Sequence, residues 1–236
     1  MATISNPTLV LANLVAAYYT AVSMTPPNPP PAKQEPESIT FFAPRSYRQH
    51  KLGILPWISP ILSQTYLVAK GVGTPSAPSS LTFFPNLYNV NPKFVTWNRY
   101  SATCLGLIGL SGMLRLYAFR SLGKDFTFEL AKPQKLKQDG IYKYLQHPSY
   151  PPLFIILVTN AAYCLAPDGF LGSFLPREVV EKLVPWKAWL WAGWALFWAN
   201  MVRKRVRDEE KMLKETFGQE WEEWHAKTAR FIPWIF

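Results

Sequence analysis

Two polar motifs stand at the two ends of one hydrophobic hairpin in this sequence. The first is His147-Pro148-Ser149-Tyr150, which opens an apolar run that extends to about Ala166. The second runs from Arg205 to Glu210 and follows another apolar run, Val184 to Val202. Because two membrane crossings return a chain to the side it left, the motifs are predicted to meet at one membrane surface. Such a site could handle a polar cosubstrate and a lipid-tailed acceptor together.

The first motif is typical of a helix start. Proline is favoured in the first turn, where backbone amides have no partner within the helix, so Pro148 is predicted to begin a helix with His147 near its cap. The neighbouring prolines lack a backbone N–H. The amides of Ser149 and Tyr150 are therefore expected to serve a carboxylate or phosphate at the positive end of the helix. An ordinary helix start, in which His147 only caps, is the alternative interpretation.

The second motif forms a stripe when it is placed on a helix. Arg205, Glu209, Leu213 and Phe217 recur at four-residue spacing and share one face. If that face meets the protein, Arg205 and Glu209 are charges at the rim of the hydrophobic region, where an unpaired charge is costly and indicates function. Glu210 is expected on the solvated side. The alternative is an exposed ion pair worth only ~0.3–0.5 kcal/mol.

Charge is strongly segregated along the 236 residues. Residues 1–32 carry no charge, whereas 120–143 and 203–230 are rich in Lys and Arg. This pattern, with ten tryptophans, is typical of a membrane protein with several spans. The net charge of +10 suits anionic lipid headgroups, so nucleic-acid binding is not expected. We predict an all-α bundle of about five transmembrane helices with a cytosolic C-terminal helical cap. The predicted spans are 8–24, 53–72, 100–119, 148–166 and 184–202.

The basic segments predict the orientation. By the positive-inside rule, loop 120–147 and the C-terminal tail are cytosolic, and the count of spans makes the N-terminus lumenal. The loop that carries Lys33, Arg45, Arg48 and Lys51 is then cytosolic as well. A signal peptide is the alternative for the first span, although no Lys or Arg precedes it. We divide the chain into an N-terminal two-span region, 1–96, and a catalytic core, 97–236.

Several single residues receive simpler interpretations. Arg115 is expected to extend toward the headgroups from the end of its span, and Cys104 and Cys164 are expected to be buried apolar residues. His50 and His225 have no ligand-like neighbours, so they are expected in solvent and no metal site is predicted. The linker 71–91, rich in Gly, Pro, Ser and Asn, is expected to be lumenal with little core. The segment Phe126-Thr127-Phe128 is expected to form part of a wall of the site.

The motifs and their surroundings resemble the isoprenylcysteine carboxyl methyltransferase family over about residues 97–236. The residues that carry the resemblance are Gly140-Ile141-Tyr142, the His147 motif, Arg205, Glu209-Glu210, Leu213, Phe217-Gly218, Glu220, Trp221 and Trp224. The resemblance implies methyl transfer from S-adenosylmethionine to the C-terminal carboxylate of a farnesylated or geranylgeranylated cysteine, forming a methyl ester, at the endoplasmic reticulum membrane. An α-carboxylate, with a pKa of ~3.5, is already ionised at neutral pH, so no general base is required.

The same resemblance implies roles for individual residues. Arg205 would meet the acceptor carboxylate, and the prenyl tail would enter from the membrane lipid. Oligomeric state is left open. The residues implied to contact S-adenosylmethionine are Gln134, Lys135, Leu136, Lys137, Tyr142, His147, Pro148, Ser149, Tyr150 and Glu209.

The sequence departs from the family pattern at two places. The family commonly has Arg before the His-Pro pair, where this chain has Gln146, and often a small residue where it has Pro151-Pro152. Three alternatives remain: an NADPH-dependent sterol or steroid reductase, a phospholipid N-methyltransferase and a membrane scaffold without activity. Ser149, where the reductases would have Asn, counts against the first.

Overall fold

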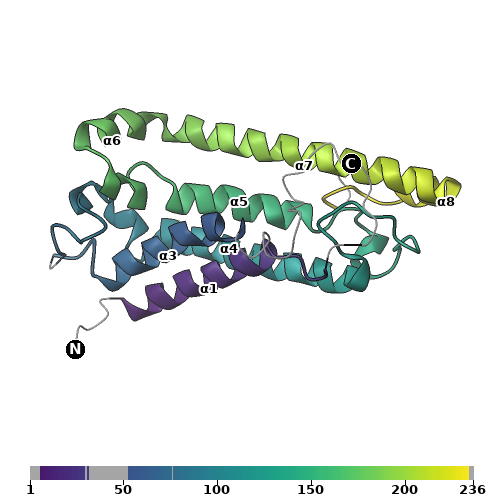
Figure 1. The fold of residues 1–236 in the computed structure, drawn as a ribbon, viewed down its shortest axis with the longest axis horizontal. Helices are drawn as coiled ribbons and strands as arrows, with labels where there is room; N and C mark the ends of the chain where they lie inside the picture. Colours follow the sequence, from purple (N-terminus) through teal and green to yellow (C-terminus); the bar gives the residue numbers. More distant parts are fainter. Residues whose placement is uncertain (1–5, 30, 32–52, 76, 234–236) are drawn as a thin grey trace.

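Helices form over each of the five predicted apolar runs. In the computed structural model, which describes residues 6–29, 31, 53–75 and 77–233, these helices lie along the long axis of an elongated bundle (Figure 1). Within this part of the chain there is no named strand, so the prediction of an all-α fold is confirmed. The long helices are α1 (Pro7–Ser23), α3 (Leu55–Ala69), α4 (Arg99–Leu122), α5 (Tyr150–Cys164) and α7 (Lys187–Phe217).

The helix ends follow local sequence chemistry. The Asn6 side chain accepts a hydrogen bond from the Leu9 amide (3.2 Å) and caps α1. α4 begins with a capping box, in which the Asn98 and Ser101 side chains each accept from the other's backbone amide. It ends at Gly123, whose φ of +65° suits glycine.

The start of α5 differs from the prediction by two residues. The helix begins at Tyr150 with Ser149 as its N-cap, so that Pro151 and Pro152 occupy the first turn, where no backbone N–H is needed. The expectation that the Tyr150 amide serves a ligand is wrong, because this amide donates to the His147 carbonyl (3.3 Å).

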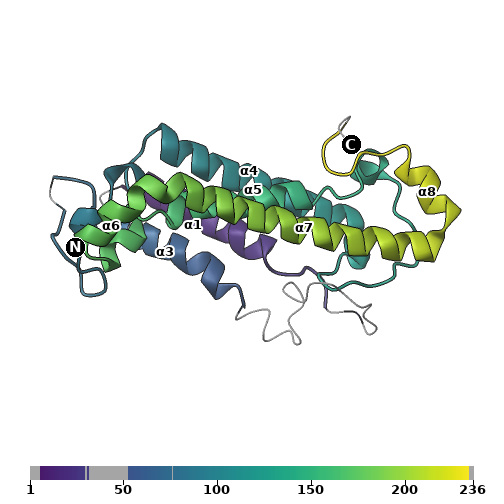
Figure 2. The ribbon, with the colours of Figure 1, turned by 90° about the horizontal axis from the view of Figure 1, so that it is seen from above.

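The packing of the long helices brings α5 next to both α4, which carries Arg115, and α7, which carries the second polar motif. α4 packs against both α1 and α5, and α5 packs against α7, as the view from above also shows (Figure 2). α4 approaches α1 closely at Gly112, where a Cβ atom would lie 2.5 Å from the Tyr19 Cβ. α5 and α7 run in opposite directions, which brings the C-terminal half of α7 back beside the start of α5 (Figure 1).

One end of the bundle is a well-packed cap of loops. Phe84, Leu87 and Val90 are only 5–6% exposed and belong to the main hydrophobic core. The segment is held to the loop after α5, since the Asn86 amide donates to the Ser173 carbonyl (2.9 Å) and the Asn91 amide to the Asp168 carbonyl (2.8 Å). The expectation that linker 71–91 has little core is therefore wrong: single apolar residues spaced along it find partners distant in the sequence.

The other end carries the polar motifs. α7 is one continuous helix of 31 residues and passes beyond its apolar half without a break. It is followed by α8 (Gln219–His225), which lies at the same end as the loop between α4 and α5 (Figure 1). The chain after α8 pairs with the residues before α5, because the amides of Gln146 and His147 donate to the carbonyls of Ala229 and Arg230 (2.9 Å each).

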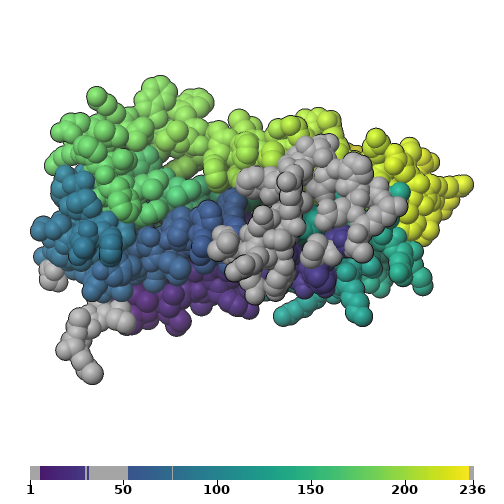
Figure 3. All heavy atoms as spheres, viewed as in Figure 1, coloured from purple at the N-terminus to yellow at the C-terminus, as the bar shows by residue number. Residues whose placement is uncertain are grey.

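The lengths of the helices and their exposed side chains indicate which of them could contact or cross a membrane. One described helical stretch, Pro92–Asp125, is long and apolar enough to cross a bilayer, while α1 and α5 are shorter apolar helices. Large apolar side chains are exposed, among them Leu11 (62%), Trp189 (73%) and Leu196 (72%). The space-filling view shows α1, α3 and the start of α7 forming the surface along one side (Figure 3). Cys104 and Cys164 are buried and free, as expected.

Candidate active site

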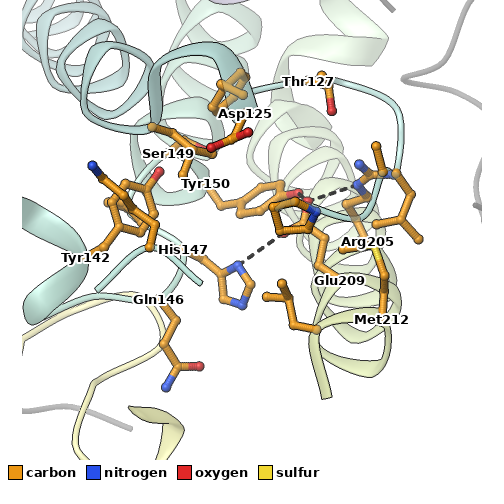
Figure 4. Close-up of a pocket in the computed structure, with 18 of the residues that line it drawn as sticks. Asp125, Thr127, Tyr142, Gln146, His147, Ser149, Tyr150, Arg205, Glu209 and Met212 are labelled. Carbon is orange, nitrogen blue, oxygen red and sulfur yellow. Dashed lines mark hydrogen bonds and ion pairs between the residues drawn. The ribbon is translucent and has the colours of Figure 1, made fainter. Parts of the chain in front are cut away.

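A cavity of about 160 Å³ lies at the end of the bundle that carries both polar motifs. Its wall combines α4, the loop that follows α4, the start of α5 and the C-terminal half of α7. Figure 4 shows the side chains of the two motifs facing one another across this space. Residues that line it include Arg115, Phe126, Phe128, Lys135, Leu136, Lys137, Tyr142, His147, Pro148, Ser149, Tyr150, Arg205 and Glu209.

Glu209 joins the two motifs. Its carboxylate accepts a hydrogen bond from the Tyr150 hydroxyl (2.6 Å) and another from Arg205 Nε (3.2 Å). Its second oxygen lies 3.2 Å from His147 Nδ1. Residues about sixty positions apart in sequence thus meet in one cluster, which confirms the predicted return of the hairpin. The stripe predicted for Arg205 and Glu209 is also correct, since Arg205 is only 3% exposed.

The cluster fixes the charges of its members. Burial by itself would raise the pKa of Glu209, but its contacts with His147, Arg205 and Tyr150 lower that pKa to about 2. Burial would lower the pKa of His147, yet hydrogen bonds to Glu209 and Glu210 and the charges of these carboxylates raise it. At neutral pH the site therefore holds an ionised carboxylate between a guanidinium and an imidazole whose pKa is raised.

Glu210 is also part of this cluster, and the expectation that it lies on the solvated side is wrong. Its side chain is 12% exposed, with one oxygen 3.5 Å from His147 Nε2. Arg230 Nε and Nη2 donate to its two oxygens at 2.8 and 3.1 Å. The cause is tertiary: the segment after α8 pairs beside His147 and brings Arg230 to this face of α7.

The loop after α4 supplies one wall. The rings of Phe126 and Phe128 stand 6.1 Å apart beside the cavity, in agreement with the expected wall. Lys135, Leu136 and Lys137 line the cavity, whereas Gln134 is exposed and does not. Tyr142 is buried, and its carbonyl accepts a hydrogen bond from Trp224 Nε1 (3.0 Å), which ties α8 to this wall.

Gln146 fastens the C-terminal segment to the site. Its side-chain nitrogen donates to the Thr228 carbonyl (2.8 Å) and hydroxyl (2.9 Å), and its oxygen lies 2.8 Å from His225 Nδ1. The His225 ring stacks on Trp221 with centroids 4.4 Å apart, so the expectation that His225 is solvated is wrong. His50 lies outside the described residues. Within those ranges, no cluster of three or more metal-binding side chains occurs.

Arg115 is the residue of this cavity that the sequence interpretation missed. It is 4% exposed, and Nε and Nη1 donate to the carbonyls of Ser23 (2.9 Å) and Ser149 (2.8 Å). It therefore points inward, and the expected extension toward headgroups is wrong. The available signal was its isolation: it is the only charge between residues 100 and 119, and a charge within an apolar span is by default a candidate for function.

Comparisons with known proteins identify a family that the chain resembles. A model of the isoprenylcysteine carboxyl methyltransferase (ICMT) family matches residues 104–175. The resemblance to this family is confirmed. The matched stretch includes α5 and the His147 motif, while the residues of α7 that complete the cavity follow it in the sequence.

Three relatives of the same family name are similar to the chain. The protein-S-isoprenylcysteine O-methyltransferase of Schizosaccharomyces pombe is 30% identical over 140 residues, which are 58% of this chain and 50% of that protein. The protein of that name from Dictyostelium discoideum is 24% identical over 65% of this chain and 54% of its own length. Protein-S-isoprenylcysteine O-methyltransferase B of Arabidopsis thaliana is 24% identical over 74% of this chain and 77% of its own length. The chain thus spans about half the length of the first two relatives.

Proposed function

We propose that this protein transfers a methyl group from S-adenosylmethionine to the C-terminal carboxylate of a prenylated cysteine. One observation carries the proposal: Arg205 and Glu209 of α7 meet the His147–Tyr150 motif of α5 in a single cavity. The names of the similar proteins described above provide the chemical class. The acceptor is a farnesylated or geranylgeranylated cysteine at the end of a protein or peptide.

The residues of the cavity suit the methyl donor. Glu209 keeps its negative charge because its pKa is about 2, and a fixed carboxylate suits a ligand with an ammonium and a sulfonium. Tyr142, the segment His147–Tyr150 and the loop residues Lys135, Leu136 and Lys137 would hold the rest of it. Gln134 has less support, because it lies outside the lining. When bound, S-adenosylmethionine supplies a methyl group on a sulfonium, so that an O–C bond forms as the C–S bond breaks and no proton moves.

Arg205 is the candidate group for the acceptor carboxylate. A guanidinium matches a carboxylate in shape and charge, and this one is buried at the cavity. Its hydrogen bond to Glu209 limits how strongly it can stabilise a second carboxylate. This limit favours reaction, because tight binding of the ground state would make the nucleophile less reactive. Orientation of the two substrates is then the main contribution, and it can supply ~7–11 kcal/mol.

The membrane gives the acceptor its route. The proposal includes five crossings by α1, α3, α4, α5 and the first half of α7, in the endoplasmic reticulum, with the site end and tail cytosolic and the N-terminus lumenal. Exposed apolar side chains such as Leu110 (53%), Trp189 (73%) and Leu196 (72%) support contact with lipid. The basic loop with Lys135 and Lys137 lies at the site end, and by the positive-inside rule this basic loop supports a cytosolic site. The prenyl tail would remain in lipid while its carboxylate reaches the cavity.

Transfer of a labelled methyl group by the purified protein tests the proposal. The protein in nanodiscs is incubated with labelled S-adenosylmethionine and an N-acetyl farnesylcysteine, or with phosphatidylethanolamine; a third incubation contains a sterol and NADPH. We expect a base-labile methyl ester on farnesylcysteine alone. Label on the phospholipid, or reduction of the sterol, would replace the proposal with one of those activities, and no product in any incubation would contradict catalysis.

A variant locates the acceptor carboxylate. Arg205→Lys keeps the charge but loses the fork of donors, so KM for farnesylcysteine should rise roughly 10-fold or more, and more than KM for the methyl donor. Arg207→Lys is the matched control, because Arg207 is exposed two residues further along the same helix. An equal rise in both KM values would show that Arg205 does not bind the acceptor.

A further inference from the structure

Arg115 presents a buried positive charge that no carboxylate neutralises within the part of the chain that the structure describes. Its partners among the described residues are two backbone carbonyls, at the end of α1 and at the start of α5, and no Asp or Glu oxygen lies within 4.0 Å of it in those ranges. Carbonyls satisfy individual N–H groups but leave the full charge in place. A buried guanidinium without a counter-ion is costly, and it is therefore a group that an anionic ligand would stabilise.

The guanidinium is held so that part of it remains available. A guanidinium has five N–H donors, and the bonds to Ser23 and Ser149 use two of them. The rings of Phe119 and Phe128 lie 4.8 and 5.7 Å from its central carbon and restrict the plane of the group. Arg115 also lines the cavity. A cation of fixed plane, with unused donors beside a cavity, is suited to bidentate binding of a carboxylate.

The position of Arg115 separates it from Arg205. Its partner Ser149 lies on the same side of Tyr150 as Tyr142, while Arg205 and Glu209 lie on the other side (Figure 4). The proposed reaction brings two carboxylates to the cavity, one on the acceptor and one on the methionine part of the methyl donor. The cavity correspondingly has two buried guanidinium groups on different helices, α4 and α7.

We propose that Arg115 binds the carboxylate of the methionine part of S-adenosylmethionine, so that each of the two arginines receives a different carboxylate. This inference rests on the proposed function. It assigns to α4 a part in substrate binding, and it explains why a charge is kept within the apolar stretch between Arg99 and Arg120.

Two probes that differ in one carboxylate test the inference. Binding of S-adenosylhomocysteine and of its decarboxylated analogue, which keeps the ammonium, is measured by calorimetry on the protein in nanodiscs. We expect Arg115→Met to weaken binding of S-adenosylhomocysteine roughly 10- to 100-fold, the range for a hydrogen bond between charged groups, and to leave the analogue within about 3-fold. Because both probes meet the same variant, general damage to the fold would weaken both equally.

Further variants make the outcome decisive. Arg120→Met is the matched control, since Arg120 is exposed in the last turn of the same helix, and it should change neither affinity. If Arg115→Met does not fold, Arg115→Lys is measured with the same probes and should show a smaller selective loss. Equal losses for both probes, or none, would overturn the role of Arg115 and leave the proposed function intact. Failure of the wild-type protein to bind S-adenosylhomocysteine would overturn both.

Discussion

Both ends of the bundle bury charged groups, but the groups have very different access to water. At the end away from the cavity, Asp168 lies 3.1 Å from Lys187 Nζ and 3.6 Å from Lys93 Nζ, and these lysine side chains are 24% and 32% exposed. At the site end the side chains of Arg205 and His147 are only 4% and 5% exposed. The cations of the first cluster can therefore be hydrated by solvent, whereas those of the second cluster are shielded from it.

This difference separates a structural use of charge from a functional one. The far end has a large apolar cluster, with Phe94 at 0% and Phe84 at 6% exposed, so burial of apolar surface stabilises it and the ion pairs add little. At the site end, Glu209 is in direct contact with both His147 and Arg205. Such a cluster is weak evidence for stability, because desolvation offsets its attraction. Its presence is better explained by the binding of charged ligands.

The strongest test of this comparison is Glu209→Gln. The variant keeps the shape but removes the carboxylate that contacts both Arg205 Nε and His147 Nδ1. Breaking a buried pair costs about 3–5 kcal/mol, and we expect methyl transfer to fall by roughly 100-fold or more. The assay with labelled methyl donor and farnesylcysteine measures this loss. Activity within a few fold of wild type would remove Glu209 from the site.

The comparison also shows what the sequence could predict. The positions of the long helices follow from apolar runs with few charges, and the contact between Glu209 and His147 follows from an even number of spans between their motifs. The start of α5 was misplaced because proline is tolerated throughout the first turn, so Pro148, Pro151 and Pro152 do not specify which residue comes first.

Other features depend on tertiary packing. The direction of Arg115 depends on which face of α4 meets α1 and α5, and the sequence of a helix with apolar residues on all sides does not reveal this. The exposure of Glu210 depends on Arg230, twenty residues away, and that of Phe84 on a loop near residue 174. Composition alone made residues 71–91 look like a loop without core, because few apolar residues are enough when their partners are distant in sequence.

A second test concerns the attachment of the C-terminal segment. Gln146→Leu has a similar size but cannot bond to Thr228 or His225, and a buried polar group left without a partner costs about 1–3 kcal/mol. Hydrogen exchange should therefore accelerate in residues 226–231 and in the loop before α5, with little change around Phe94 at the far end. Tyr144→Leu is the control, because that side chain is 60% exposed. Uniform acceleration over both ends would show that they are not separate units.

A third test uses pH. The pKa of His147 is raised in the folded protein, so its contribution to stability is fully present below its unfolded pKa of about 6.5 and is lost as pH rises through the folded value. The pKa of Glu209 falls from 4.5 to about 2, so its contribution is present above about pH 4.5 and is lost in acid. The cluster should be most stabilising between these limits. Above pH 6.5, stability should decline by at most ~1.4 kcal/mol per pH unit.

Thermal unfolding in nanodiscs from pH 5 to 9 measures this decline. His147→Gln has no group that titrates in this range at the site, so the decline attributable to the imidazole should be absent, while other ionisable groups behave as in wild type. The difference between the two curves isolates His147. Curves that stay parallel across the range would show that the imidazole is not the group that titrates.

The smallest effect is expected at the far end, from Asp168→Asn. The substitution removes a carboxylate that Lys187 and Lys93 contact, but both lysines already reach solvent and can be hydrated once the acid is gone. We expect a loss of about 1 kcal/mol or less in the free energy of unfolding, and methyl transfer within about 2-fold of wild type. Chemical denaturation and the transfer assay measure the two quantities on one preparation. A loss of activity as large as that of Glu209→Gln would mean that the charged cluster at the far end also serves the reaction. The difference in solvent access between the cations of the two clusters would then not separate a structural cluster from a functional one.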